Sequence, residues 1–207
     1  MTESVDTLTM KQKYVLIFDF CSSTSIMENL ILLEKQERWR NLLIDIKKFL
    51  VEERVTHGFE IYKFIGDGWI LLFDIDFPPK ELFSFLKRLC DRYKSSYKKN
   101  IREILSTTID NIGITFGLDK GSLMRVVMDS HPEYIGRPLK IATRLQGAIK
   151  DKDLEPQGKV LMSKIVYDDV KRIISKDYKV CPVKRNLRNI SGGDRYPAIK
   201  LMLYEKP

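Results

Sequence analysis

The chain has 207 residues, of which 43% are hydrophobic and 31% are charged, and it contains three cysteines. This composition excludes a disordered or disulfide-dense protein and fits one globular domain over residues 1–207, with residues 1–12 as a flexible N-terminus. There is no run of about 18 apolar residues, and Met1–Lys13 lacks the apolar core of a secretion signal, so we expect no membrane association and a cytoplasmic protein. The net charge of +8 favours an anionic partner, a nucleotide or a nucleic acid, although solvated helix surfaces explain much of it.

Apolar periodicity and the positions of glycine and proline predict the elements in chain order. The predicted elements are a strand at Tyr14–Phe20, a helix over Ile26–Arg54 that breaks near Leu33, a hairpin over Glu60–Phe73, a helix from Pro78–Pro79 to about Leu105, a hairpin formed by Asn111–Leu118 and Ser122–Met128, helices at Arg137–Ala148 and Ser163–Ser175, and strands at Tyr178–Val183 and Ala198–Tyr204. A polar surface connection is expected from Lys150 to Gly158. This order favours an α+β fold, an antiparallel-sheet sandwich with helices packed on it.

Two acidic residues stand where strand-like runs stop. Asp19 lies near the end of Tyr14–Phe20, and Asp67 occupies the turn of the Glu60–Phe73 hairpin. Two carboxylates on neighbouring strands form a site for Mg²⁺ or Mn²⁺, because hard cations prefer oxygen ligands. Such a site serves nucleotidyl chemistry when substrate phosphates complete the coordination.

Three segments resemble the class III nucleotidyl cyclases, the adenylate and guanylate cyclase homology domain. In the order of the family's motifs, the segments are Phe18–Thr24, Lys63–Gly68, and Gly113–Gly117 followed by Tyr134–Leu145. The family's fold is related to polymerase palms and to ferredoxin-like domains. The resemblance implies that Asp19, the backbone carbonyl of Phe20 and Asp67 bind two Mg²⁺ or Mn²⁺ ions.

The resemblance also implies a substrate site shared between two chains. Arg144 matches the arginine that stabilises charge on the α-phosphate in the transition state, and in this family that arginine comes from the partner chain. A stand-alone domain is therefore expected to form a homodimer with two symmetric sites. Lys140 stands where the family usually has an asparagine that orients the ribose; a lysine there either binds phosphate or ribose, or weakens catalysis.

Further residues are implied in substrate binding. The loop where a helix begins after the first acid is expected to face the phosphates with its N–H groups; it comprises Cys21, Ser22, Ser23 and Thr24. Lys63 and Glu133 match the two positions at which adenylate cyclases recognise adenine, with glutamate in place of aspartate. A cross-strand ion pair is the alternative role for Lys63. The extra methylene of Glu133 and the lysine at position 140 fit a smaller base.

Together these implications predict a metal-dependent cyclase that converts a nucleoside triphosphate into a 3′,5′-cyclic nucleotide and pyrophosphate. Short stand-alone cyclases of bacterial anti-phage (Pycsar) systems, which make cyclic UMP or cyclic CMP, resemble this chain, and we favour that function. One alternative is an adenylate cyclase that makes cyclic AMP, as Lys63 with Glu133 suggests. The other is a degenerate cyclase-like or palm-like domain that binds nucleotide or nucleic acid. Nucleic acid is the less expected partner, because two strand-end acids repel phosphate unless a metal lies between them.

Overall fold

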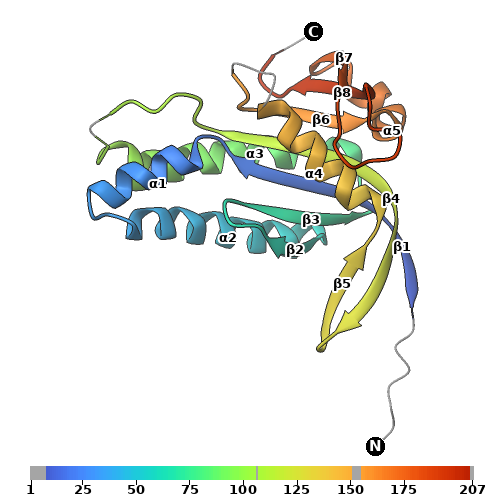
Figure 1. Ribbon diagram of the computed structural model, residues 1–207, viewed down its shortest axis with the longest axis horizontal. Coiled ribbons are helices and arrows are strands. Elements are labelled where there is room, and N and C mark those ends of the chain that lie inside the picture. The colour runs from blue at the N-terminus through green and yellow to red at the C-terminus, as the bar shows by residue number, and fades with distance from the viewer. Residues whose placement is uncertain (1–7, 106, 151–154, 206–207) are drawn as a thin grey trace, which may run out of the picture.

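The computed structural model describes residues 8–105, 107–150 and 155–205, and Figure 1 shows its helices and strands. In chain order the elements are β1 (Thr9–Phe20), α1 (Ser23–Leu32), α2 (Glu37–His57), β2 (Glu60–Phe64), β3 (Gly68–Asp74), α3 (Pro79–Tyr97), the π-helix η1 (Lys98–Arg102), β4 (Ile114–Met128), β5 (His131–Ile135), α4 (Arg137–Lys150), β6 (Lys159–Ser163), α5 (Lys164–Ile174), β7 (Lys179–Arg185) and β8 (Tyr196–Met202). Within these described ranges, no helix is long and apolar enough to cross a lipid bilayer.

One eight-stranded sheet organises the chain. Its strands follow the order β2-β3-β1-β4-β6-β8-β7, and β5 pairs with β4 outside this path. Strands β4 and β6 run parallel, whereas the other pairs formed by the described strands are antiparallel. The predicted α+β fold is therefore confirmed, and β1 lies inside the sheet with β3 and β4 as its neighbours.

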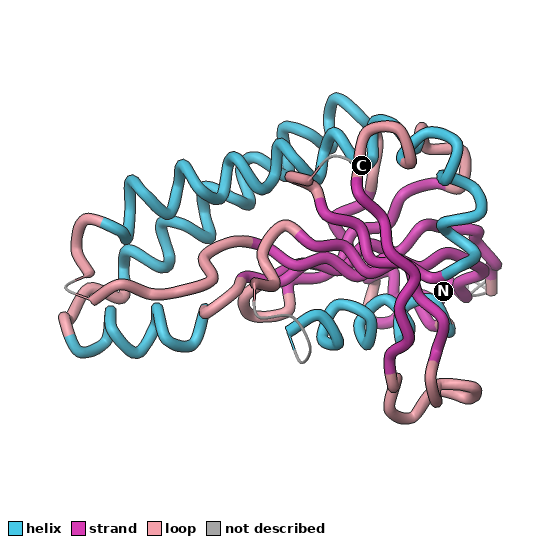
Figure 2. Tube along the Cα trace, turned by 90° about the horizontal axis from the view of Figure 1, so that it is seen from above, coloured by secondary structure: helices cyan, strands magenta, loops and turns pink. Residues whose placement is uncertain are grey.

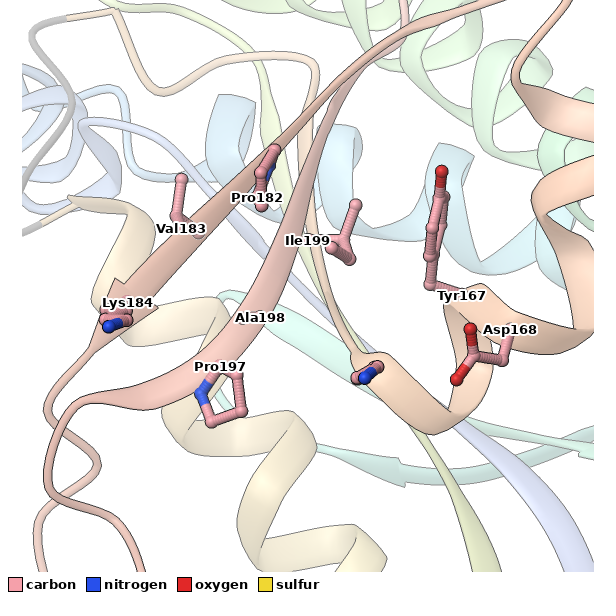
Figure 3. Close-up of a pocket in the computed structure, with 9 residues that line it drawn as sticks. Tyr167, Asp168, Pro182, Val183, Lys184, Pro197, Ala198 and Ile199 are labelled. Atoms are coloured by element: carbon pink, nitrogen blue, oxygen red, sulfur yellow. The ribbon is translucent and has the colours of Figure 1, made fainter.

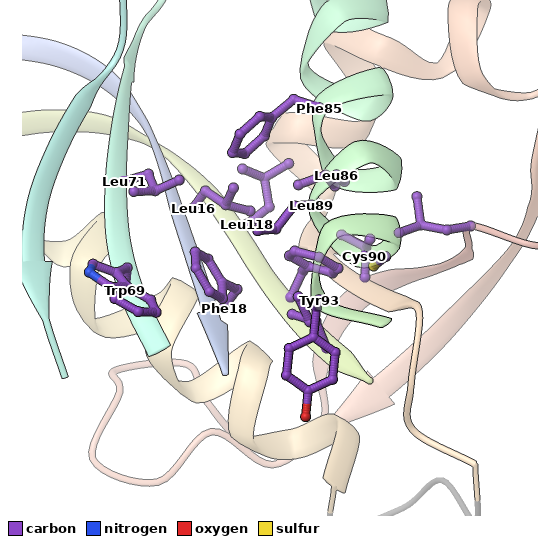
Figure 4. Packing of buried hydrophobic residues seen from close by; sticks show 14 of the residues in the cluster. Leu16, Phe18, Trp69, Leu71, Phe85, Leu86, Leu89, Cys90, Tyr93 and Leu118 are labelled. Atoms are coloured by element: carbon purple, nitrogen blue, oxygen red, sulfur yellow. The ribbon is translucent and has the colours of Figure 1, made fainter. Parts of the chain in front are cut away.

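Helices pack on both faces of this sheet. Successive residues of β1 alternate between two cores, because the side chains of a strand point to opposite faces. Leu16 and Phe18 pack with residues of α1, α2, α3 and α5, whereas Val15 and Ile17 pack with Ala142 of α4. Figure 4 shows α3 residues packed against β1 and β3 in the first core, and Figure 2 shows helices on both sides of the strands. Helix α4 thus reaches the sheet from the face opposite α2 and α3.

Several predicted boundaries are confirmed. The helical stretch breaks as expected near Leu33, since α1 ends at Leu32 and α2 begins at Glu37. Glu60–Phe73 forms the β2–β3 hairpin. Pro79 is the first residue of α3, a position where its missing N–H costs no helical hydrogen bond.

The predicted hairpin between Asn111–Leu118 and Ser122–Met128 is wrong, because most of both segments belongs to the single strand β4. Gly121 lies between the two predicted strands, but it pairs with Lys13, and the β1–β4 ladder runs through it without interruption. The turn lies instead at Asp129–Ser130, whose φ values of 48° and 64° are typical of a two-residue hairpin loop. Strand β5, which was not predicted, follows that turn.

Strand β6 and the N-terminal part of β1 were not predicted from the sequence. Strand β6 follows directly after the expected surface connection. Thr9–Gln12, expected to be flexible, extend β1 instead, because β4 continues beyond the core and offers backbone partners at Ser122–Arg125. Residues 1–7 of that predicted segment lie outside the described residues.

Candidate active site

The two predicted acids lie side by side at one end of the β1–β3 pair. Asp19 is opposite Gly68 in the antiparallel ladder, and Asp67 directly precedes Gly68. The Phe20 N–H donates to the Asp67 carbonyl oxygen at 3.1 Å, which ties the two strand ends together. Gly68 is required here, since an added Cβ would lie 1.9 Å from the carbonyl oxygen of Phe18. The local sequence therefore brings two carboxylates to one edge of the sheet.

Each of these carboxylates accepts a hydrogen bond from a buried side chain. Gln146 of α4 donates from Nε2 to Asp19 Oδ2 at 3.3 Å and to Thr115 Oγ1 at 2.8 Å. The Ser23 hydroxyl at the start of α1 donates to Asp67 Oδ2. Gln146 was missed by the sequence analysis, because it is 127 positions away from Asp19 and no local pattern marks it. Ser23, whose N–H is expected to face the phosphates, uses its hydroxyl to bind one of the two acids.

The loop from Cys21 to Thr24 is held by its own hydrogen bonds. Ser22 has a left-handed φ of 57°, and its hydroxyl donates to the carbonyl oxygen of Asp110 at 2.8 Å. The Cys21 N–H donates to the Gly113 carbonyl at 2.9 Å, and the Cys21 side chain is buried. We therefore correct the expectation that Cys21 offers its N–H to a phosphate. Thr24, in the first turn of α1, is exposed and remains a candidate contact.

Lys63 and Glu133, which the resemblance pairs in base selection, are brought together by β2 and β5. The Lys63 Nζ lies 3.6 Å from Glu133 Oε1. The Tyr62 hydroxyl donates to Glu133 Oε2, and this hydrogen bond, with the Lys63 charge adding to it, holds the pKa of Glu133 below its ordinary value. Tyr62 was not singled out in the sequence. Its pKa is raised, chiefly by burial and then by the hydrogen bond to Glu133.

Lys140 and Arg144 lie one helical turn apart on the exposed side of α4. Gln146, which contacts Asp19, lies on the buried side of the same helix. At about 100° per residue, positions 144 and 146 are separated by roughly 200° around the helix axis. Arg144 therefore faces away from the two acids of its own chain.

A second cluster of metal-ligating side chains lies between α2 and α3. It consists of Glu53, His57 and Glu81, whose ligand atoms lie within 4.8 Å of one another. However, Arg88 Nη2 lies 2.6 Å from an oxygen of each glutamate and 3.4 Å from His57 Nε2. The guanidinium already supplies the positive charge that a metal ion would bring. We therefore assign this cluster to an ion-pair network that joins the two helices.

An apolar groove of about 530 Å³ lies between α5 and the β7–β8 hairpin (Figure 3). Its walls include Tyr167, Pro182, Pro197 and Ile199, with Lys164, Asp168 and Lys184 also lining it. It contains neither of the two acids nor the Lys63–Glu133 pair. The candidate site is therefore the open edge at Asp19 and Asp67, not this groove.

Solved structures resemble the fold over nearly its whole length. The adenylyl cyclase CyaB from P. aeruginosa is 19% identical with a TM-score of 0.71, and the match covers 97% of each chain. The guanylyl cyclase Cya2 is 14% identical with a TM-score of 0.62, covering 94% of this chain and 92% of its own. The guanylate cyclase domain of RhGC from Catenaria anguillulae, solved in complex with GTP, is 15% identical with a TM-score of 0.61, covering 94% and 98%. The sequence matches no protein-family model and no curated protein significantly. The chain therefore has the fold of the class III adenylyl and guanylyl cyclase catalytic domains.

Proposed function

We propose that this protein is a metal-dependent nucleotidyl cyclase that converts a nucleoside triphosphate into a 3′,5′-cyclic nucleotide and pyrophosphate. The observation that carries the proposal is the placement of Asp19 beside Gly68 with Asp67 next in the turn, each carboxylate bound by a buried donor. An acid that only stabilises a turn would not need a second acid beside it. Two acids at one strand edge, on the fold of nucleotidyl cyclases, suit a site for divalent cations.

The donor set at this edge fits Mg²⁺ or Mn²⁺. Two carboxylates and the backbone carbonyl of Phe20 are hard oxygen ligands, and phosphate oxygens of a substrate would complete the coordination. We propose two ions, which when bound lower the pKa of the attacking 3′-hydroxyl and neutralise the leaving pyrophosphate. The chain's own part is to fix the ligands: Gln146 orients Asp19, and Ser23 orients Asp67. We propose that Thr24, which is exposed in the first turn of α1, contacts phosphate oxygens.

The transition-state arginine must come from a second copy of the chain. Arg144 is exposed and faces away from Asp19 and Asp67 of its own chain, as does Lys140. In a two-fold dimer, α4 of the partner can present Lys140 and Arg144 to the two acids Asp19 and Asp67. Each of the two sites then uses residues of both chains. Arg144 then stabilises charge that develops on the α-phosphate, and Lys140 binds the triphosphate or the ribose.

The arm formed by β4 and β5 supports this homodimer. Figure 1 shows the hairpin projecting from the body beside the N-terminal end of β1. It exposes Met128 and Ile135 by 54% and 46%, and the adjacent Met10 of β1 by 59%. Apolar side chains gathered on a projecting arm are typical of a surface that contacts another chain. We assign this surface to the second copy.

For the substrate we propose a pyrimidine nucleoside triphosphate, with cyclic UMP or cyclic CMP as the product in bacterial anti-phage signalling in the cytoplasm. Glu133 is one methylene longer than the aspartate of adenylate cyclases, which leaves less room for a purine beside Lys63. Cyclic AMP is the second candidate product, because the Lys63–Glu133 pair at 3.6 Å also offers the donor and acceptor that adenine needs.

The test is incubation of the purified protein with ATP, GTP, CTP and UTP separately in Mn²⁺, with detection of cyclic product and pyrophosphate by mass spectrometry. One cyclic pyrimidine is the expected product. Asp19→Asn and Asp67→Asn should abolish turnover, whereas Asp74→Asn, which removes an acid at the other end of β3 that binds Lys13, should not. Absence of product from all four nucleotides, or full activity in either metal-site variant, would refute the proposal.

A further inference from the structure

A β-bulge in β2 lets the consecutive residues Tyr62 and Lys63 both contact Glu133. Ile61 and Lys63 pair with adjacent residues of β3, so Tyr62 is an extra residue between two successive rungs of the ladder. In a regular strand, Tyr62 and Lys63 would point to opposite faces of the sheet. Because of the bulge, both side chains reach Glu133 of β5.

The two oxygens of Glu133 have different partners. Tyr62 Oη donates to Oε2, whereas Lys63 Nζ lies 3.6 Å from Oε1. Tyr62 is itself held in place by its neighbour on β5. Its ring packs edge-on against Tyr134 with centroids 5.2 Å apart, and its oxygen accepts a hydrogen bond from the Tyr134 N–H at 3.1 Å. A half-buried phenol with two contacts to Tyr134 therefore anchors a glutamate that would otherwise sample several rotamers.

We propose that Tyr62 is a positioning residue that sets nucleobase selectivity by fixing Glu133 beside Lys63. The inference rests on the proposed cyclase function and deepens it at the base-binding pair. With Oε2 taken by Tyr62, the pair presents one acceptor, Oε1, next to one donor, the Lys63 ammonium. A glutamate with several accessible rotamers could bind a purine or a pyrimidine. A single fixed rotamer is therefore what makes the Lys63–Glu133 pair selective.

The chemistry of the bases defines what this pair recognises. A complementary base edge carries one hydrogen-bond donor next to one acceptor: the amino group and N3 of cytosine, the N3–H and a carbonyl of uracil, or the amino group and N1 of adenine. These edges lie at different distances from the ribose. A carboxylate held at one position therefore favours one ring size, and we expect it to favour the pyrimidines.

The experiment is Tyr62→Phe, which keeps the ring and its packing and removes only the hydroxyl. Steady-state kinetics with each of the four triphosphates in Mn²⁺ should show KM for the preferred nucleotide rising about tenfold, since a hydrogen bond to a charged group is lost. The kcat should stay within about twofold, because the lost interaction orients the base and not the reacting phosphate. Discrimination in kcat/KM should fall by the same factor as KM rises.

Tyr134→Phe is the matched control. It removes a hydroxyl from the same aromatic pair, but that hydroxyl donates to Glu60 Oε2 at 2.8 Å and not to Glu133. Discrimination should therefore be retained in Tyr134→Phe and lost in Glu133→Gln. Isothermal titration of each nucleotide in Ca²⁺ measures base discrimination without turnover. If the wild type makes no product, the cyclase proposal fails, while this titration still decides the role of Tyr62. Wild-type discrimination in Tyr62→Phe, or equal losses in Tyr62→Phe and Tyr134→Phe, would overturn the inference.

Discussion

Replacement of Gln146 tests the metal-site assignment through a residue that is not itself a proposed ligand. Its side chain is buried, and its Nε2 lies 3.3 Å from Asp19 Oδ2 and 2.8 Å from Thr115 Oγ1. Gln146→Met keeps the length and approximate volume of the side chain but removes both donated hydrogen bonds. Asp19 then loses a partner that orients its carboxylate toward the edge of the sheet.

The expected size of the effect follows from the hydrogen-bond geometry. Loss of an outer-sphere partner of a metal ligand typically costs about 10–100-fold in metal affinity. The bond to Asp19 at 3.3 Å is longer than an ideal N–H···O contact, so we expect the lower end of that range, a Mn²⁺ dissociation constant raised about tenfold. The shorter bond to Thr115 is neutral, and its loss should lower the free energy of unfolding by about 1 kcal/mol.

Titration of free Mn²⁺ by electron paramagnetic resonance measures the affinity, and urea unfolding in the absence of metal measures the stability. Thr143→Ala is the control, because its hydroxyl lies on the exposed side of α4 and bonds only to the Leu139 carbonyl of its own helix among the described contacts. It should bind Mn²⁺ like the wild type. Wild-type Mn²⁺ affinity in Gln146→Met would refute the idea that Asp19 is a metal ligand oriented from α4.

Two further predictions concern the dimer and the close approach of the strands. Neither Asp67→Ala nor Arg144→Ala should be active alone. An equal mixture of the two variants that is allowed to exchange chains should recover about a quarter of the wild-type rate, because half of the dimers then hold one intact site of two. No recovery in an exchanged mixture would argue against shared sites. Gly68→Ala places a methyl group against the Phe18 carbonyl and should lower the free energy of unfolding by about 3 kcal/mol in urea titrations, whereas Gly147→Ala meets no atom within 4 Å and should raise it by about 0.5–1 kcal/mol. Equal stability of the two glycine variants would contradict the packing described for β1 and β3.

The sequence by itself determined where the two acids Asp19 and Asp67 lie. An apolar run that stops at Phe20 and a turn flanked by Gly66 and Gly68 are local signals, and both place an acid where a strand ends. The start of α3 at Pro79 could also be predicted from adjacent residues alone, because proline suits the first turn of a helix. The resemblance to the cyclases added the pairing of Lys63 with Glu133, which the structure brings within 3.6 Å.

The tertiary structure alone decided which side chains support these residues. Gln146 lies 127 positions from Asp19, and their contact exists only after α4 packs on the sheet. Tyr62 lies 71 positions from Glu133, and their contact exists only after β2 and β5 come together. The break predicted between Leu118 and Ser122 is wrong for the same reason: the conformation of Gly121 depends on β1, its partner in the ladder, and not on its neighbours in sequence. Local chemistry identifies an acid, but the orientation of that acid comes from packing between distant segments, and no single segment of the sequence contains it.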